Sequence, residues 1–200
     1  MNILPFTIDI PQASLDDLER RLQATRWPDE SEGSGWAMGA SLSYMKELAQ
    51  YWREGYDWRA AETRLNAFPQ FTASVDGLDL HFIHVRGKGP NPTPLLLLHG
   101  WPDSFYRFIK VIPLLTDPAR FGGDPARSFD VVVPSLPGFG FSTRPTAPGG
   151  MRSTASAEGL ARLMTEGLGH ERYLVSGGDI GARVARLMAI AHPEQILGLH

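Results

Sequence analysis

The sequence has no cysteine among its 200 residues, which excludes disulfide bonds, thiol nucleophiles and thiolate metal sites together. It also has no run of about 20 apolar residues of the kind that a membrane-spanning helix needs. Lysine and arginine form no cluster and the net charge is -3, so nothing indicates a nucleic acid or an anionic membrane as a partner. Residues 1–6 lack the positive charge and the long apolar stretch of a secretory signal. We therefore expect a soluble, cytoplasmic protein with no membrane span.

Enough apolar material is present for a sizeable core, because 42% of the residues are hydrophobic and 10% are aromatic. The 21 glycines and 16 prolines separate apolar segments, which is typical of ordered turns rather than disorder. The length fits one domain or a part of a larger one.

The first 68 residues predict a helical segment. Ser14 and Asp17 have the spacing of a capping box, and Asp57 is placed to cap a later helix. Residues 1–13 are expected to be extended or irregular. Helices are expected at residues 14–26, 43–54 and 58–66.

From residue 69 to residue 200 the pattern is that of an α/β core. The pair Asp76-Gly77 between two apolar runs predicts a β-hairpin, and the apolar run 94–98 predicts a strand buried on both faces. Strands then alternate with helices, which predicts a mostly parallel sheet with helices on both faces. Strands are expected at residues 71–75, 78–85, 94–98, 129–133, 172–176 and 196–200, and helices at 105–115, 153–168 and 180–192.

A sharp turn from strand to helix is expected at Asp179. The pattern is that of the nucleophile elbow, G-x-S-x-G, with Asp179 at the position of the serine. Gly177 and Gly181 lack the side chains that would block so tight a turn. The helix N-terminus favours an ionised carboxylate, which can attack an sp3 carbon and form an ester. Taken alone, an aspartate here also fits a helix cap.

Two further polar segments follow predicted strands. His99-Gly100-Trp101-Pro102 comes directly after the strand 94–98, and residues 134–142 come after the strand 129–133. Open α/β sheets place their sites at the carboxyl ends of the strands. The three segments together therefore favour a nucleophile over a cap at Asp179.

These segments resemble, in order and spacing, the α/β-hydrolase fold, and the first of them together with an aspartate nucleophile looks like its epoxide hydrolase branch. The N-terminal part is similar to the N-terminal region of microsomal-type epoxide hydrolases, and the resemblance covers essentially the whole chain. The motifs that carry it are Pro5-Phe6-x-Ile8, Arg26-Trp27-Pro28, Tyr51-Trp52 to Trp58-Arg59, residues 99–106 and Pro113-Leu114-Leu115-Thr116.

The resemblance implies that Asp179 attacks a lipophilic epoxide to give an ester, which water hydrolyses to a vicinal diol. The backbone N–H groups of Trp101 and Ile180 are then placed to form an oxyanion hole. Trp101, Pro102 and Phe105 either line a substrate pocket or pack under the loop. His99 is expected to orient its loop rather than act as a base, because the chain order in this fold is nucleophile, acid, histidine.

The family also uses a histidine base, its acid partner and two lid tyrosines, which all follow the sixth strand. No histidine or tyrosine of this chain matches those positions, so we expect the lid, the last strands and the parts for turnover to lie outside it. The chain would then be the first half of a longer protein or one piece of a two-piece assembly. No cofactor and no metal are implied. Asp130 is interpreted as a surface or structural carboxylate, and no motif surrounds His81, His84, His170 or His200.

Two other functions stay open. A haloalkane or haloacid dehalogenase shares the fold and the nucleophile, although it often has a tryptophan directly after the nucleophile, where this chain has Ile180. The chain could instead be an inactive fragment or a partner subunit that lacks the base. These functions allow two kinds of protein partner. One is another copy of the chain in a homo-oligomer, and the other is a second chain that carries the missing half.

Overall fold

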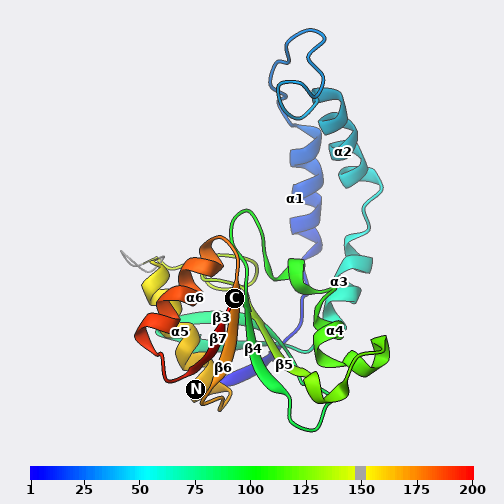
Figure 1. The fold of residues 1–200 in the computed structure, drawn as a ribbon. Coiled ribbons are helices and arrows are strands. Elements are labelled where there is room, and N and C mark those ends of the chain that lie inside the picture. The colour runs from blue at the N-terminus through cyan, green and yellow to red at the C-terminus, as the bar shows by residue number, and fades with distance from the viewer. Residues whose placement is uncertain (147–151) are drawn as a thin grey trace. The chain divides into compact units, whose positions relative to one another are not determined.

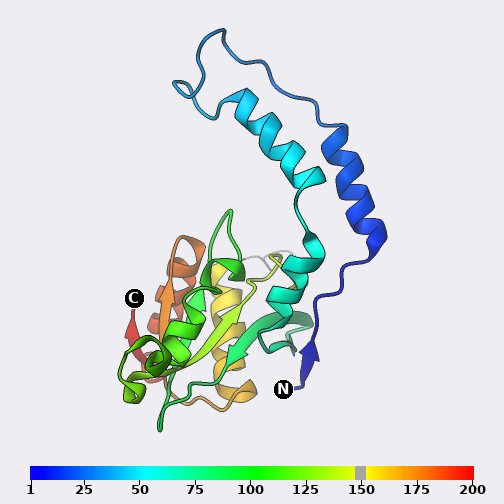
Figure 2. The ribbon, with the colours of Figure 1, turned by 90° about the vertical axis from the view of Figure 1, so that its right-hand side faces the viewer.

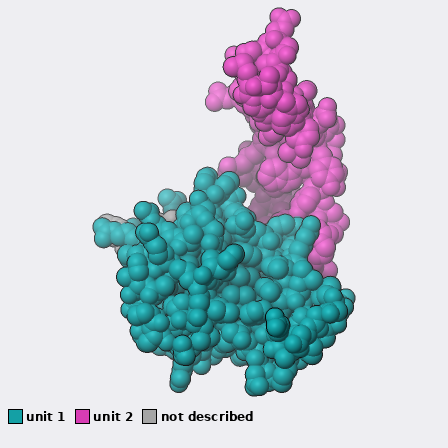
Figure 3. All heavy atoms as spheres, in the orientation of Figure 1, with its two compact units in different colours: residues 1–7, 68–200 teal, residues 8–67 magenta. Residues whose placement is uncertain are grey.

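The computed structural model describes residues 1–146 and 152–200. The chain forms two compact units, one of residues Ile8–Ala67 and one that joins Met1–Thr7 to Phe68–His200 (Figure 3). Within the described ranges, no helix is long and apolar enough to cross a bilayer.

The unit Ile8–Ala67 contains three helices among its described residues: α1 (Gln12–Gln23), α2 (Leu42–Glu54) and α3 (Trp58–Asn66). The side chain of Asp57 accepts the Ala60 N–H at 2.9 Å, which confirms the predicted cap of α3. The prediction of a capping box at Ser14 is wrong. Helix α1 begins earlier, directly after Pro11, and no side chain caps it. Asp17 instead pairs with Arg21 one turn later, at 2.6 Å.

The second unit is built on a mixed sheet with the strand order β1-β2-β3-β5-β4-β6-β7. The strands are β1 (Ile3–Phe6), β2 (Gln70–Val75), β3 (Leu78–Val85), β4 (Thr93–Leu98), β5 (Phe129–Pro134), β6 (Tyr173–Gly177) and β7 (Ile196–Leu199). The neighbours from β5 through β4 and β6 to β7 are parallel, and those from β1 to β5 are antiparallel. The α/β-hydrolase fold class is confirmed, with a larger antiparallel part than expected. Part of the excess is β1, which lies in residues 1–13, a stretch expected to be extended or irregular.

Helices cover both faces of the sheet. On one face lie α5 (Ser153–Arg162), which continues into the π-helical turn η4 (Leu163–Gly167), and α6 (Ile180–Ala191) (Figures 1 and 2). The other face carries η1 (Phe105–Phe108) and α4 (Ile112–Thr116). A continuous helix over 105–115 is therefore wrong. Pro113 in the first turn of α4 explains the break, since proline cannot donate the backbone hydrogen bond of a helix interior. Short 3-10 turns follow at η2 (Pro118–Phe121) and η3 (Pro125–Arg127).

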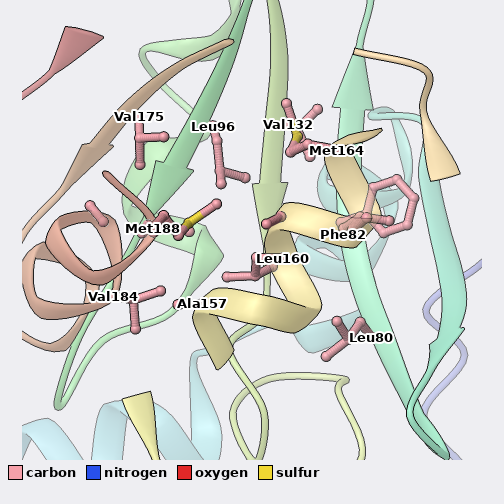
Figure 4. Packing of buried hydrophobic residues seen from close by; sticks show 14 of the residues in the cluster. Leu80, Phe82, Leu96, Val132, Ala157, Leu160, Met164, Val175, Val184 and Met188 are labelled. Atoms are coloured by element: carbon pink, nitrogen blue, oxygen red, sulfur yellow. The ribbon is translucent and has the colours of Figure 1, made fainter. Parts of the chain in front are cut away.

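The main core lies between the sheet and helices α5 and α6. Figure 4 shows Leu160 and Met188 of these helices beside Leu96 of β4, and all three side chains are fully buried. Burial of such side chains supplies the dominant favourable free energy of folding. The same packing fixes the end of β6 against the start of α6, where Asp179 lies.

His81 is a buried polar residue at the centre of β3. Its Nδ1 lies 2.9 Å from Ser135 Oγ and its Nε2 lies 2.9 Å from Gln70 Oε1. Burial lowers the pKa of His81 from 6.5 to about 4. Between these two pH values the His81 ring is neutral in the folded protein, whereas it binds a proton in the unfolded chain. The folded state therefore loses stability as the pH falls from about 6.5 toward about 4.

We expect the His81 contribution to lower the free energy of unfolding by about 2 kcal/mol between pH 7 and pH 5. Urea unfolding of the protein and of His81→Gln at both pH values measures it, and the variant should show a smaller pH effect. His192→Gln is the control, because His192 lies near the surface beside Glu158. An equal pH effect in the protein and in His81→Gln would contradict the expectation.

Candidate active site

Asp179 occupies the bend between β6 and α6. Its backbone has φ 55 and ψ -119, a sparsely populated conformation for a residue with a side chain. Holding such a conformation costs on the order of 1–3 kcal/mol, and strain of this kind is concentrated at functional sites. The sharp elbow expected from the sequence is thus present in the backbone.

The bend is tight because two glycines allow close backbone approach. A Cβ at Gly177 would lie 2.5 Å from the carbonyl carbon of Gly181. A Cβ at Gly181 would lie 2.4 Å from the carbonyl oxygen of Leu98 and 2.6 Å from that of His99. These neighbours are backbone atoms of α6, of the end of β4 and of the loop after it, so they cannot move aside independently.

Gly181→Ala should therefore destabilise the fold by about 3 kcal/mol, the upper part of the range for overpacking. In a domain of this size that loss lowers the Tm by roughly 6–12 °C. Gly159→Ala in α5 is the matched control, because its new Cβ would meet only Val75 Cγ1 at 3.4 Å. Alanine is also the better helix former, so this control should be neutral or slightly stabilising. Thermal unfolding of both variants measures the difference in Tm. Equal Tm values for Gly181→Ala and Gly159→Ala would show that a Cβ at Gly181 does not clash with the backbone as described.

The carboxylate of Asp179 is held by backbone N–H groups on both sides. Trp101 N donates a hydrogen bond to Asp179 Oδ1 at 2.9 Å. This bond is the largest cause that lowers the pKa of Asp179 below its usual 3.8, and the backbone N–H of Ile180 adds to the effect. The exposed carboxylate is therefore ionised at neutral pH, which a nucleophile requires.

His99 joins two of the strand-end loops from a fully buried position. Its Nε2 accepts the Leu136 N–H at 3.0 Å, and its Nδ1 lies 3.1 Å from the Gly100 carbonyl oxygen. A carbonyl can only accept and an amide can only donate, so the neutral ring carries its proton on Nδ1. Burial lowers the pKa of His99. With both nitrogens engaged, the contacts fit the predicted orienting role better than that of a base.

The three residues suggested for a substrate pocket differ in exposure. Trp101 is 71% exposed and Pro102 is also exposed, whereas Phe105 is 4% exposed. The Phe105 ring packs edge-on against His81 with centroids 5.1 Å apart, so Phe105 lies under the loop. A pocket role for Trp101 and Pro102 stays a prediction.

Sequence reasoning missed two neighbours of Asp179. A Cβ at Gly100 would lie 2.5 Å from both Cβ and Oδ1 of Asp179, so Gly100 must lack a side chain. Arg107 Nη1 would lie 3.3 Å from a Cβ at Gly178, which places a guanidinium beside the elbow. Gly100 could have been recognised as a glycine in the segment that follows the strand 94–98, whereas no sequence pattern pointed to Arg107.

Family comparisons agree with this geometry. The model of the epoxide hydrolase N terminus matches residues 3–108, and that of the alpha/beta hydrolase fold matches residues 93–200. The chain belongs to the epoxide hydrolase family. Its type is the microsomal one, which carries this N-terminal region.

Individual relatives of this epoxide hydrolase chain match along its whole length. It is 38% identical to epoxide hydrolase 1 of Oryctolagus cuniculus, covering 100% of this chain and 44% of that protein. The crystal structure of juvenile hormone epoxide hydrolase from the silkworm Bombyx mori matches with a TM-score of 0.88 and 34% identity, covering 100% of this chain and 52% of that one. Aspergillus niger epoxide hydrolase matches with a TM-score of 0.84, 32% identity and the same coverage. The chain thus spans about half the length of its relatives.

Proposed function

We propose that the protein opens a lipophilic epoxide through a covalent ester on Asp179, and that water then hydrolyses the ester to a vicinal diol. One observation carries the proposal: an ionised carboxylate at a strained strand-to-helix bend, held by the N–H groups of Trp101 and Ile180. A serine at this position would attack carbonyl carbon, whereas a carboxylate suits attack on the sp3 carbon of a strained ring.

In the first step, a carboxylate oxygen of Asp179 attacks an epoxide carbon from the side opposite the ring oxygen. The carbon–oxygen bond of the ring breaks, and the released alkoxide takes up a proton from an acid. The product is a hydroxyalkyl ester of Asp179. The hydrogen bonds that lower the Asp179 pKa also fix the direction of the carboxylate before the attack.

In the second step, water attacks the Asp179 carbonyl carbon after a base removes its proton. The carbonyl oxygen becomes an oxyanion, which the N–H groups of Trp101 and Ile180 stabilise. Each such donor is typically worth about 10²–10³ in rate. The acyl carbon–oxygen bond then breaks, so the diol leaves with an oxygen that belonged to Asp179.

The base and the proton donor for the ring oxygen are further parts of the proposal. His99 is unsuited to be the base because both of its ring nitrogens are already engaged. Because the chain spans 44% of its rabbit relative, we place the base, its acid partner and the proton donor in sequence beyond these 200 residues or in a second chain.

Product analysis tests the proposal. The protein at its native full length is incubated with styrene oxide and, separately, with a haloalkane; diol is measured by chromatography and halide by ion electrode. We expect diol and no halide. Halide release without diol would assign the dehalogenase reaction instead. If neither product forms, an epoxide adduct on Asp179 would support a nucleophile that lacks its base, and no adduct would overturn the proposal.

A further inference from the structure

A second cluster of titratable side chains lies at the end of the sheet opposite the carboxyl ends of the parallel strands, where Asp179 lies. Asp130 is at the start of β5 and His170 precedes β6, whereas Asp179 follows the end of β6. The strands from β5 through β4 to β6 are parallel, so their starts lie at the edge opposite the candidate active site. His84, near the end of the antiparallel β3, reaches the same edge. The cluster is therefore distinct from the catalytic elbow.

The three side chains offer converging ligand atoms. His84 Nε2 lies 3.7 Å and His170 Nε2 lies 3.6 Å from Asp130 Oδ2. One ligand atom from each residue lies within 4.8 Å of the others. The side chains of His84, Asp130 and His170 are 7%, 6% and 10% exposed. The site is thus built inside the protein rather than on its surface.

Both imidazole Nε2 atoms are buried and make no hydrogen bond within the described part of the chain. Leaving a buried polar atom unpaired costs roughly 1–3 kcal/mol, and native proteins rarely accept that cost twice at one place. Two buried ring nitrogens beside one carboxylate, unpaired among the described residues, are the donors that a metal ion would satisfy.

We propose that His84, Asp130 and His170 bind one divalent transition-metal ion, with Zn²⁺ as the ion that this donor set fits. Imidazole nitrogens and a carboxylate oxygen are ordinary Zn²⁺ ligands at about 2.0–2.2 Å. Tetrahedral ligands at that distance lie about 3.3–3.5 Å apart. The two histidine nitrogens must therefore move slightly toward Asp130 and also toward each other, since the three atoms now lie within 4.8 Å of one another. Water takes the fourth position. The ion would join β3, β5 and the segment before β6, and its fourth position would stay open to solvent or ligand, as in other Zn²⁺ sites with three protein ligands.

Arg86 is the group that competes with the ion. Arg86 Nη1 lies 2.7 Å from Asp130 Oδ2, and its side chain is 69% exposed, so it can turn out to solvent. Asp130 would still accept the Gly87 N–H at Oδ1, at 3.3 Å. If a metal binds, removing Arg86 should tighten binding, because a competing cation is lost. If the cluster is only an ion-pair group, no variant of Arg86 should bind metal.

The test is equilibrium dialysis of the untagged, full-length protein against Zn²⁺, with the metal measured by mass spectrometry. We expect one Zn²⁺ per chain and a Tm rise of about 3–5 °C at Zn²⁺ about 100-fold above Kd, on the scale of a chain as long as its relatives. Arg86→Gln should bind more tightly, and His170→Gln at least about tenfold more weakly. His170 lies in a loop before β6, so this variant is used in case His84→Gln fails to fold.

His192→Gln is the matched control, because His192 pairs with Glu158 away from the cluster. It should bind Zn²⁺ as the unmodified protein does. No stoichiometric Zn²⁺ in both the protein and Arg86→Gln would overturn the proposal. Zn²⁺ binding of unchanged strength in His170→Gln would also overturn it, because the ion would then be held elsewhere.

Discussion

Asp179→Asn is expected to lower the rate of epoxide opening by about 10⁴-fold or more, the scale on which nucleophile removal acts in covalent catalysis. The neutral amide keeps an oxygen that can accept the Trp101 N–H, so the loop contact survives. It has no carboxylate oxygen to attack the ring carbon, however. The stability should change little, since asparagine tolerates positive φ at least as well as aspartate. Diol formation by the full-length variant is the measurement.

Asp76→Asn is the matched control, because Asp76 also has positive φ, at 51°. Its partner is Arg162, and both side chains are largely exposed, so the loss of this pair should have little effect. The control therefore makes the same chemical change at another aspartate with positive φ. Activity of Asp179→Asn within tenfold of that of Asp76→Asn would show that Asp179 is not the nucleophile.

Gly100→Ala is expected to lower the same rate by about 10²–10³-fold. The new Cβ would lie 2.5 Å from Asp179 Cβ and Oδ1, so it must push the carboxylate away from the Trp101 N–H. That displacement removes an oxyanion donor and misplaces the nucleophile, while the fold outside the elbow stays the same. Single-turnover adduct formation, followed by intact mass, separates this loss from any loss in ester hydrolysis.

The control for Gly100→Ala is Gly178→Ala, directly beside Asp179. Its new Cβ would meet only the end of the Arg107 side chain, at 3.3 Å, and that flexible group can move. We expect at most a few-fold change in rate. If Gly178→Ala is as damaging as Gly100→Ala, any added bulk near the elbow is harmful and the specific contact with Asp179 is not the cause.

Short-range signals predicted part of the local structure, although the capping box at Ser14 and the helix over 105–115 were wrong. The Asp76-Gly77 turn and the Asp57 cap depend on residues within a few positions, and both hold. The elbow also follows from a local pattern, since Gly177 and Gly181 flank Asp179 in the sequence. These features could be predicted because the competing conformations are excluded by neighbouring atoms.

Long-range pairing explains what the sequence did not reveal. Strand β1 forms because Ile3 pairs with Ala73. No sequence pattern near Ile3 indicates this contact. The cluster of His84, Asp130 and His170 likewise joins three separate segments, and Asp130 is buried. Its assignment as a structural carboxylate holds, whereas a surface position is wrong.

The central claim is that Asp179 becomes covalently esterified and is freed by attack of water on its own carbonyl carbon. A single turnover of the full-length protein in ¹⁸O-water, followed by peptide mass spectrometry, tests it most directly. The account predicts one ¹⁸O in the peptide that contains Asp179 and an unlabelled first diol. Label in the first diol with none in Asp179 would mean that water opens the epoxide directly, and would contradict the account.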